Sequence, residues 1–122
     1  SHTVALRGDG RVFAIGASPD GRCDTAAWHD VVDIACGVRH TAAVLSDGHC
    51  VATGDNSRGQ CAVGDWENVV MIACGEFHTA GVTADGRVLV AGNAGGEACR
   101  VEDLRDVISV ACLPEASTPT VI

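Results

Sequence analysis

The sequence contains no lysine, and its eight basic residues are arginines scattered along the chain. Sixteen aspartates and glutamates outnumber them, so the net charge is −8 at pH 7. An acidic surface repels phosphate groups, and we therefore expect no nucleic acid partner. No apolar run approaches the roughly 18 residues of a membrane-spanning helix, so we expect no membrane partner either.

Aromatic side chains are also scarce, with only Phe13, Trp28, Trp66 and Phe77 in 122 residues. Hydrophobic residues still make up 47% of the chain, which is enough for the core of one modest domain and excludes general disorder. That core has to be built from valine, isoleucine, alanine, leucine and cysteine. No stretch of helix length shows the periodicity of an amphipathic helix, so the pattern favours strands.

A period of 38 residues runs through the chain without a gap, and it is marked by His-Thr pairs that begin at His2, His40 and His78. Repeats of this length are typical of propellers and solenoids. We expect a single repeat domain over residues 1–122. Its predicted repeats are 2–39, 40–77 and 78–115, with 116–122 as a C-terminal tail or partial fourth repeat.

The residue pattern of each repeat predicts three short strands. The first ends at an Asp-Gly pair, a strong hairpin signal, and the second ends at a glycine. A polar loop of about a dozen residues leads to the third. The expected first strands are 3–7, 41–45 and 79–83, the second 12–15, 50–53 and 88–91, and the third 31–36, 69–74 and 107–112. We interpret the recurring glycines as structural positions: Gly10, Gly48 and Gly86 in the turns, and Gly16, Gly54 and Gly92 after the second strands.

Many short strands at even spacing are typical of a propeller, a sandwich or a β-solenoid. The small residues of the first strands, such as Thr-Ala-Ala-Val in the second repeat, favour sheets that approach each other closely. We therefore expect an all-β fold of roughly three β-propeller blades, each with about three antiparallel strands. Such a chain is a partial propeller, or part of a ring that another chain or further sequence completes.

The middle repeat carries three motifs of a known family. They are Gly-x-x-His-Thr at residues 37–41, Asp-Gly at 47–48, and Gly-Asp-Asn-x-x-Gly-Gln at 54–60. Together they resemble the regulator-of-chromosome-condensation repeat, and the resemblance extends from residue 1 to about residue 112. The short period is similar to the compact bacterial version of the repeat, which also includes a propeller-type β-lactamase-inhibitor protein. The resemblance implies a β-propeller, typically of seven blades.

A seven-bladed ring of 38-residue repeats needs more than twice the length of this chain. We therefore consider three arrangements: a fragment of a longer ring, a homodimer that closes a ring, and an open arc. In the dimer, the last third strand of one copy would join the first strands of the other. The tail falls at a first-strand position, and its Pro119 suits an edge or a terminus.

We expect a non-enzymatic scaffold that binds a protein partner through loops on one face. Trp28 and Trp66 are the candidate anchors, although packing beneath the loops is the alternative role for both. The candidate hydrogen-bonding residues at the rim are Asp55, Asn56, Arg58 and Gln60. The acidic balance favours a partner with a basic patch. Two further functions stay open: an inhibitor that plugs an enzyme's active site, and a structural segment that completes a larger propeller.

The histidines and cysteines invite a chemical interpretation that the repeat does not favour. Each repeated histidine is expected to anchor the turn before its strand through a backbone hydrogen bond. No Cys-x-x-Cys pair signals zinc, and we interpret Cys36, Cys74 and Cys112 as small buried hydrophobes. No unique Cys-His-Asx set breaks the repeat, so we expect no enzyme, no metal and no cofactor. The odd number of cysteines favours the cytoplasm over a secreted location.

Overall fold

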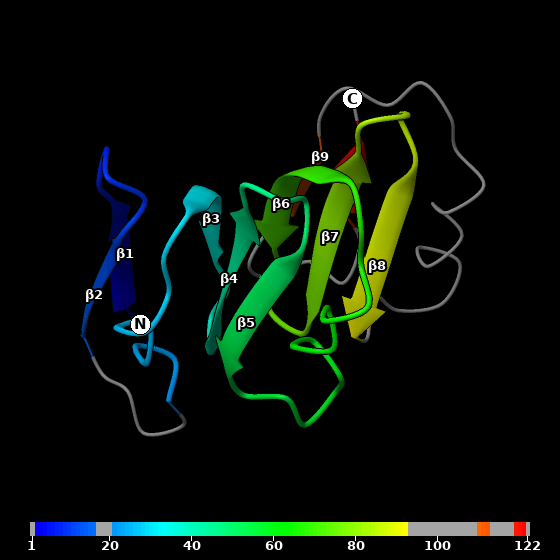
Figure 1. The fold of residues 1–122 in the computed structure, drawn as a ribbon. Helices are drawn as coiled ribbons and strands as arrows, with labels where there is room; N and C mark the ends of the chain where they lie inside the picture. The colour runs from blue at the N-terminus through cyan, green and yellow to red at the C-terminus, as the bar shows by residue number, and fades with distance from the viewer. Residues whose placement is uncertain (1, 17–20, 93–109, 113–118, 122) are drawn as a thin grey trace.

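The computed structural model describes residues 2–16, 21–92, 110–112 and 119–121, and within them strands are joined by turns and loops (Figure 1). The strands are β1 (His2–Leu6), β2 (Val12–Gly16), β3 (Val31–Cys36), β4 (His40–Leu45), β5 (Cys50–Gly54), β6 (Val69–Cys74), β7 (His78–Thr83), β8 (Val88–Gly92), β9 (Val110–Cys112) and β10 (Pro119–Val121). The first eight agree with the expected strands to within one residue at each end. No helix in this part of the chain is long and apolar enough to cross a membrane.

The strands form four antiparallel sheets. Two have three strands, in the orders β3-β4-β5 and β6-β7-β8, and two have two strands, β1-β2 and β9-β10. Each three-stranded sheet joins the third strand of one sequence repeat to the first two strands of the next. The sheets are therefore offset from the predicted repeats 2–39, 40–77 and 78–115, whose boundaries stay a prediction.

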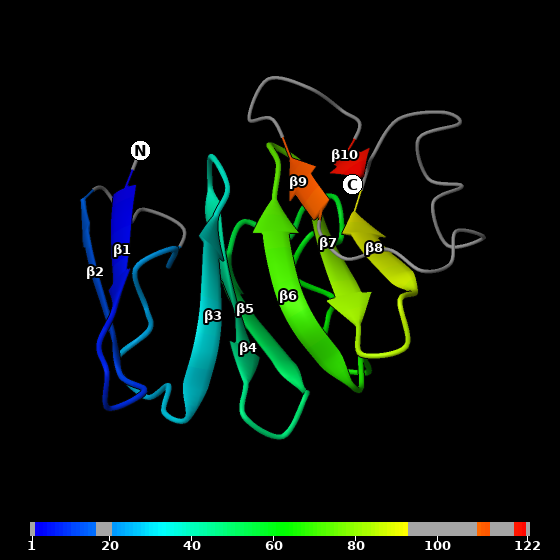
Figure 2. The same ribbon diagram turned by 90° about the horizontal axis from the view of Figure 1, so that it is seen from above.

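The sheets follow one another in chain order from the N-terminal hairpin to β9 and β10, as Figure 2 shows. This arrangement is a partial β-propeller. The strand β10 pairs with β9, and Pro119 lies opposite Cys112. The tail therefore takes a first-strand position, with the proline at the first residue of its strand, where it removes the least from the hydrogen-bond ladder.

Small side chains allow the sheets to pack closely. Ala42 and Ala43 in β4 are fully buried, and their side chains point to opposite faces of the sheet because the strand has a period of two. Ala43 joins a cluster with residues of the first hairpin, whereas Ala42 joins a cluster with β6. The core is therefore a series of layers between successive sheets.

The two third strands share an irregularity in their pairing with the first strands. The register of β3 on β4 shifts between Val31 and Asp33, and that of β6 on β7 shifts between Val69 and Met71. Such a bulge leaves one extra residue without a partner in the neighbouring strand. The two extra residues, Val32 and Val70, are 55% and 56% exposed, although Val31 and Val69 immediately before them are buried.

Candidate interaction surfaces

The three-stranded sheets have two ends that differ in character. Asp-Gly turns join β4 to β5 and β7 to β8 at one end, which we call the turn end. The opposite end, which we call the loop end, is where His40 and His78 begin β4 and β7. The long loop after β5 starts at the loop end at Asp55. It returns to the turn end at Asn68, because β6 runs antiparallel to β7.

The loop 55–60 is braced by its own side chains. The Asp55 carboxylate accepts hydrogen bonds from the backbone N–H of Ser57 at 2.9 Å and from Nε2 of Gln60 at 3.3 Å. Oε1 of Gln60 accepts the N–H of Arg58 at 2.9 Å, and the side-chain oxygen of Asn56 accepts the N–H of residue 61 at 2.9 Å. These bonds satisfy backbone groups that a free loop would leave to water, so the loop is held in one shape.

The structure divides the four predicted rim residues between surface and interior. Asn56 and Arg58 are exposed and Asp55 is partly exposed, whereas Gln60 is fully buried. Both ends of the Gln60 amide form hydrogen bonds within the loop, so this residue supports the rim from beneath. The same repeat position holds Arg22, which is also buried, and neither residue type signals this burial in the sequence.

The loop end also contains an aromatic residue that the sequence analysis did not select. The guanidinium of Arg58 lies over the ring of Phe77, 4.4 Å from its centroid. A cation at this distance from an aromatic face is attracted by the ring quadrupole. Phe77 belongs to the loop before β7, whereas Arg58 belongs to the loop after β5, so two successive sheets contribute to one pair, in which Arg58 is exposed and Phe77 is half-buried. The signal in the sequence was an aromatic residue immediately before a repeated histidine.

The tryptophans are not brought together with the loop 55–60. Trp66 is half-buried, and its ring lies against Gly81 in the middle of β7, 3.0 Å from the place that a Cβ there would take. Trp28 is also half-buried and packs against the cluster of Val12, Val31 and Ala43. Their contacts are those of residues that hold the long loops against the sheets.

Two of the repeated histidines, His2 and His40, link neighbouring sheets. Nε2 of His2 lies 2.6 Å from Oγ1 of Thr41, and Nε2 of His40 lies 2.8 Å from Oγ1 of Thr79. The Thr79 hydroxyl donates its one hydrogen to the carbonyl of Gln60 at 2.7 Å. It can therefore only accept from the imidazole, so His40 carries its proton on Nε2. The sequence analysis expected a backbone hydrogen bond from each repeated histidine, and the structure adds a bond from His2 and His40 to a hydroxyl of the next sheet. The structural role of these histidines stays a prediction.

The buried imidazoles also explain the glycine of the Gly-x-x-His-Thr motif. The His40 ring lies where a Cβ of Gly37 would be, and the His78 ring lies where a Cβ of Gly75 would be. Any larger residue at either glycine would collide with the ring three residues later. Glycine is therefore required by close contact with a side chain, and not by its backbone conformation.

The environment of His40 keeps its ring neutral. Burial is the main cause that lowers its pKa, to about 4, and the neighbouring His78 and His2 lower the pKa further, whereas Asp55 raises it. Burial also lowers the pKa of His78. In the described residues, Nδ1 of His40 has no hydrogen-bond partner, so a second proton there would be buried without an acceptor.

Cys36 and Cys74 occupy different environments although they share one repeat position. Cys74 is buried and its Sγ donates to the carbonyl of Ala35 at 3.6 Å, whereas Cys36 is exposed. The prediction that Cys36 is buried is therefore wrong: it faces the two-stranded sheet β1-β2, and Cys74 faces a complete sheet. Thiol side chains are present at Cys23, Cys36, Cys50, Cys61 and Cys74. No three metal-ligating side chains gather in the described part of the chain.

Residues 31–60 and 69–95 match the family of the Regulator of chromosome condensation (RCC1) repeat. The two matches begin at the first residues of β3 and β6, so each contains one three-stranded sheet. The chain contains RCC1 repeats. No curated protein sequence is similar enough to this one to count as a match. The further resemblance of its RCC1 repeats to the compact bacterial type stays a prediction.

Solved structures of RCC1-repeat and propeller proteins resemble the chain. Prp20p from Saccharomyces cerevisiae, described with its binding to Gsp1p and histones, shares 26% identity with a TM-score of 0.62, and the match covers 75% of this chain and 28% of Prp20p. Yeast RCC1 (Prp20) bound to Kap60 gives a TM-score of 0.72 at 21% identity, covering 93% and 38%. The CRINKLY WD40 ectodomain of the Arabidopsis thaliana receptor kinase ACR4 gives 0.73 at 16%, covering 93% and 41%.

The chain thus spans less than half the length of each of these structures. The second and third likenesses show the propeller fold alone, because identities of 16% and 21% do not carry function. RCC1-type propeller repeats are typically non-catalytic interaction modules, and the architecture seen here agrees with that general role.

Proposed function

We propose that the chain is a non-enzymatic protein-interaction scaffold that binds a protein partner through the loop end of successive sheets. The observation that carries this proposal is the Arg58–Phe77 pair, which joins loops from two neighbouring sheets. Arginine is among the residue types that dominate interface hot spots, and aromatic residues are enriched at interfaces. That an RCC1-repeat protein, Prp20p, is described with protein partners supports the proposal by analogy.

The loop 55–60 favours binding because its shape is already fixed. Its hydrogen bonds hold the backbone and the side chains of Asp55 and Gln60, so a partner orders little beyond Asn56, Ser57 and Arg58. Less ordering on association leaves more of the contact energy as affinity. Trp28 and Trp66, which are half-buried, contribute by holding the long loops in place.

A photo-crosslinking side chain at position 58 tests the proposal in cells of the source organism. Arg11 is the control site, since it is an exposed arginine at the turn of the first hairpin, away from the loop end. We expect a defined protein to crosslink from position 58 and not from position 11. The purified partner should then bind the Phe77→Ala variant at least about tenfold more weakly than the parent chain. Crosslinking that is equal at the two positions, or unaffected binding by Phe77→Ala, would contradict the proposal.

A homodimer that closes a ring is the second arrangement to consider. It would place β1 of one copy beside β9 of the other, but β10 occupies that place in the structure. Closure by a second copy therefore requires β10 to leave β9. The mass of the chain in solution tests this: a dimer that persists at low concentration would support closure, and a monomer would leave the scaffold acting alone.

A further inference from the structure

A second surface lies at the turn end, away from the loop 55–60. A groove of about 330 Å³ separates the sheet β3-β4-β5 from the sheet β6-β7-β8 there. The side chains that matter for its chemistry are Val32, Leu45, Val70 and Ala84 on its apolar parts and Asp47 and Asn68 on its polar parts.

The apolar lining is exposed for a structural reason. Val32 and Val70 are the extra residues of the two bulges, so neither has a partner in the neighbouring strand that would turn it into the core. They occupy the same position of successive repeats and line one groove from its two sides. The groove therefore presents two branched apolar side chains with more than half of each exposed to water.

The floor of the groove is held by backbone hydrogen bonds between the two sheets and their loops. Ser46 N–H donates to the carbonyl of Asp30 at 2.7 Å, and Ala84 N–H donates to the carbonyl of Asn68 at 2.8 Å. Val69 N–H donates to the carbonyl of Gly48 at 3.0 Å. Gly48 has a φ of +87° and its Cα hydrogen faces Asn68, where a Cβ would come within 3.0 Å of the backbone. The groove is thus preformed.

The rim of the groove carries negative charge. Asp47 lines it, and the exposed carboxylates of Glu67 and Asp85 adjoin the lining residues Asn68 and Ala84 in sequence. Asp30 is also exposed, and its carbonyl is bonded to Ser46 of the lining. Arg87 lies near Asp85 and lowers its pKa, after the larger effect of the hydrogen bond from Thr83. The imidazoles of His29 and His49 lie 2.8 Å from Asp30 and 3.3 Å from Asp47.

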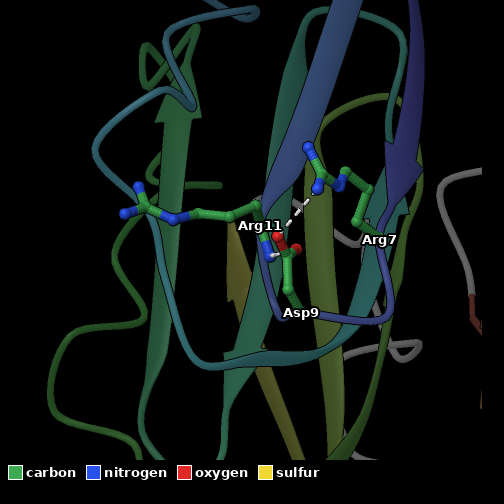
Figure 3. A network of polar contacts seen from close by, with 3 residues as sticks. All are labelled: Arg7, Asp9 and Arg11. Atoms are coloured by element: carbon green, nitrogen blue, oxygen red, sulfur yellow. Dashed lines mark hydrogen bonds and ion pairs between the residues drawn. The ribbon is translucent and has the colours of Figure 1, made fainter.

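The junction between the sheet β1-β2 and the sheet β3-β4-β5 lacks the acidic rim of the groove. Arg7 occupies the repeat position of Leu45, and its guanidinium pairs with Asp9 at 3.1 Å, while Asp9 also accepts the backbone N–H of Arg11 at 3.1 Å (Figure 3). Arg7 further lies over the ring of Phe13. There the carboxylate of the Asp-Gly turn is neutralised within the chain, whereas in the groove Leu45 leaves Asp47 without an arginine at the equivalent position.

We infer that this groove docks an extended segment of a partner protein in which one branched apolar side chain is flanked by arginine or lysine. The apolar side chain lies between Val32 and Val70, and the flanking cations lie beside Asp47 and the exposed carboxylates of the rim. Charge complementarity selects the segment, and desolvation of the two valines supplies most of the affinity. This surface is separate from the one at Arg58, and the two can be tested independently.

Fluorescence polarisation with two labelled peptide pools tests the inference. In the first pool, short peptides of glycine, serine and threonine carry a central leucine with arginine two residues to either side. The second pool has glutamate in place of arginine. We expect the first pool to bind the full chain at least about tenfold more tightly than the second. Val70→Asp should weaken binding of the first pool by a similar factor. Asp47→Asn should weaken binding of the first pool and should not weaken binding of the second pool, because it removes a charge that repels glutamate.

Two variants are controls. Ile15→Asp introduces a charge at another exposed apolar residue outside the groove, and Arg58→Ala alters the loop end; neither should change binding of the first pool. Equal binding of the two pools, no binding at millimolar concentration, or unchanged binding by a folded Val70→Asp variant would overturn the inference. Concentration-dependent dimerisation that Val70→Asp abolishes would also overturn it, because a second copy would then be the occupant.

Discussion

The imidazole of His40 donates to the hydroxyl of Thr79 across the boundary between two sheets, and the two atoms are 2.8 Å apart. The same hydroxyl donates to the carbonyl of Gln60, which lies in the long loop between β5 and β6. One threonine therefore connects β4 of one sheet, the loop of the repeat and β7 of the next sheet. His2 and Thr41 repeat this arrangement one period earlier, with the carbonyl of Arg22 as the acceptor.

Replacement of Thr79 by valine should destabilise the chain by about 2 to 4 kcal/mol, because the change keeps the volume but leaves a buried N–H and a buried carbonyl unpaired. Thr3→Val is the matched control, since Thr3 has the same repeat position on β1 and is exposed. Its effect should lie within about 0.5 kcal/mol of zero. Urea unfolding measures both, and equal effects at the two sites would show that the hydrogen bonds between sheets contribute nothing.

The stability of the chain should fall as the pH falls from about 6.5 towards 4. The pKa of His40 is lowered from 6.5 to about 4 in the folded chain, so over this range the unfolded chain binds a proton that the folded chain does not. Stability is therefore fully present above pH 6.5, and the loss due to His40 reaches about 3 kcal/mol at pH 4. His78, whose pKa burial also lowers, adds to the loss in the same direction.

Urea unfolding at several pH values measures this dependence. The His40→Gln variant should show a smaller change between pH 7 and pH 4.5, because one of the two buried imidazoles no longer titrates. The carboxyl pKa values of Asp47 and Asp85 are lowered chiefly by hydrogen bonds, from the His49 N–H and the Thr83 hydroxyl respectively, so both carboxylates titrate below this range. An identical pH profile for the parent and the variant would contradict the assignment to His40.

Alanine at Gly75 should destabilise the chain by roughly 2 kcal/mol or more, because the added Cβ overlaps the His78 ring and overpacking a core is costly. Gly64→Ala is the control, since nothing lies within 4 Å of a Cβ at that glycine. Thermal unfolding compares the two variants. A Gly75→Ala variant as stable as Gly64→Ala would mean that the ring is free to move away.

The thiol of Cys36 should react with a soluble disulfide reagent well before those of Cys50 and Cys74. Cys36 is exposed, although its pKa is raised, mainly by partial burial. Cys50 is buried and its pKa is raised to about 12, so its reactive thiolate forms only after local opening. Mass spectrometry of partially labelled protein measures the order. Early labelling of Cys50 would show that the middle sheet opens more easily than its packing indicates.

Much of the strand pattern could be predicted because it depends on near neighbours along the chain. The Asp-Gly pair at 47–48 forces a hairpin between β4 and β5 wherever they lie, so both strands were predictable to within a residue. The bulges at Val32 and Val70 had no such local signal. They arise because the third strand must pair with the next hairpin while its first residue bonds to a neighbouring turn.

The candidate site was less predictable, because exposure depends on which sheet lies next to a residue. Asn56 and Gln60 are both polar residues of one loop, yet Asn56 is exposed, whereas Gln60 lies beneath the loop with its carbonyl bonded to Thr79 of the next sheet. Phe77 entered the site only through its contact with Arg58, which is 19 residues away in the sequence. Sequence periodicity does not report such contacts.

The sequence by itself determined the period of 38 residues, the hairpins and the RCC1-type motifs, because these follow from residue types at fixed spacing. Only the tertiary structure decided which strands share a sheet, which threonine each histidine bonds, and which end of the strands holds each surface. Cys36 and Cys74 show the reason. Their local sequences are nearly the same, but the two-stranded sheet beside one and the three-stranded sheet beside the other cover different areas.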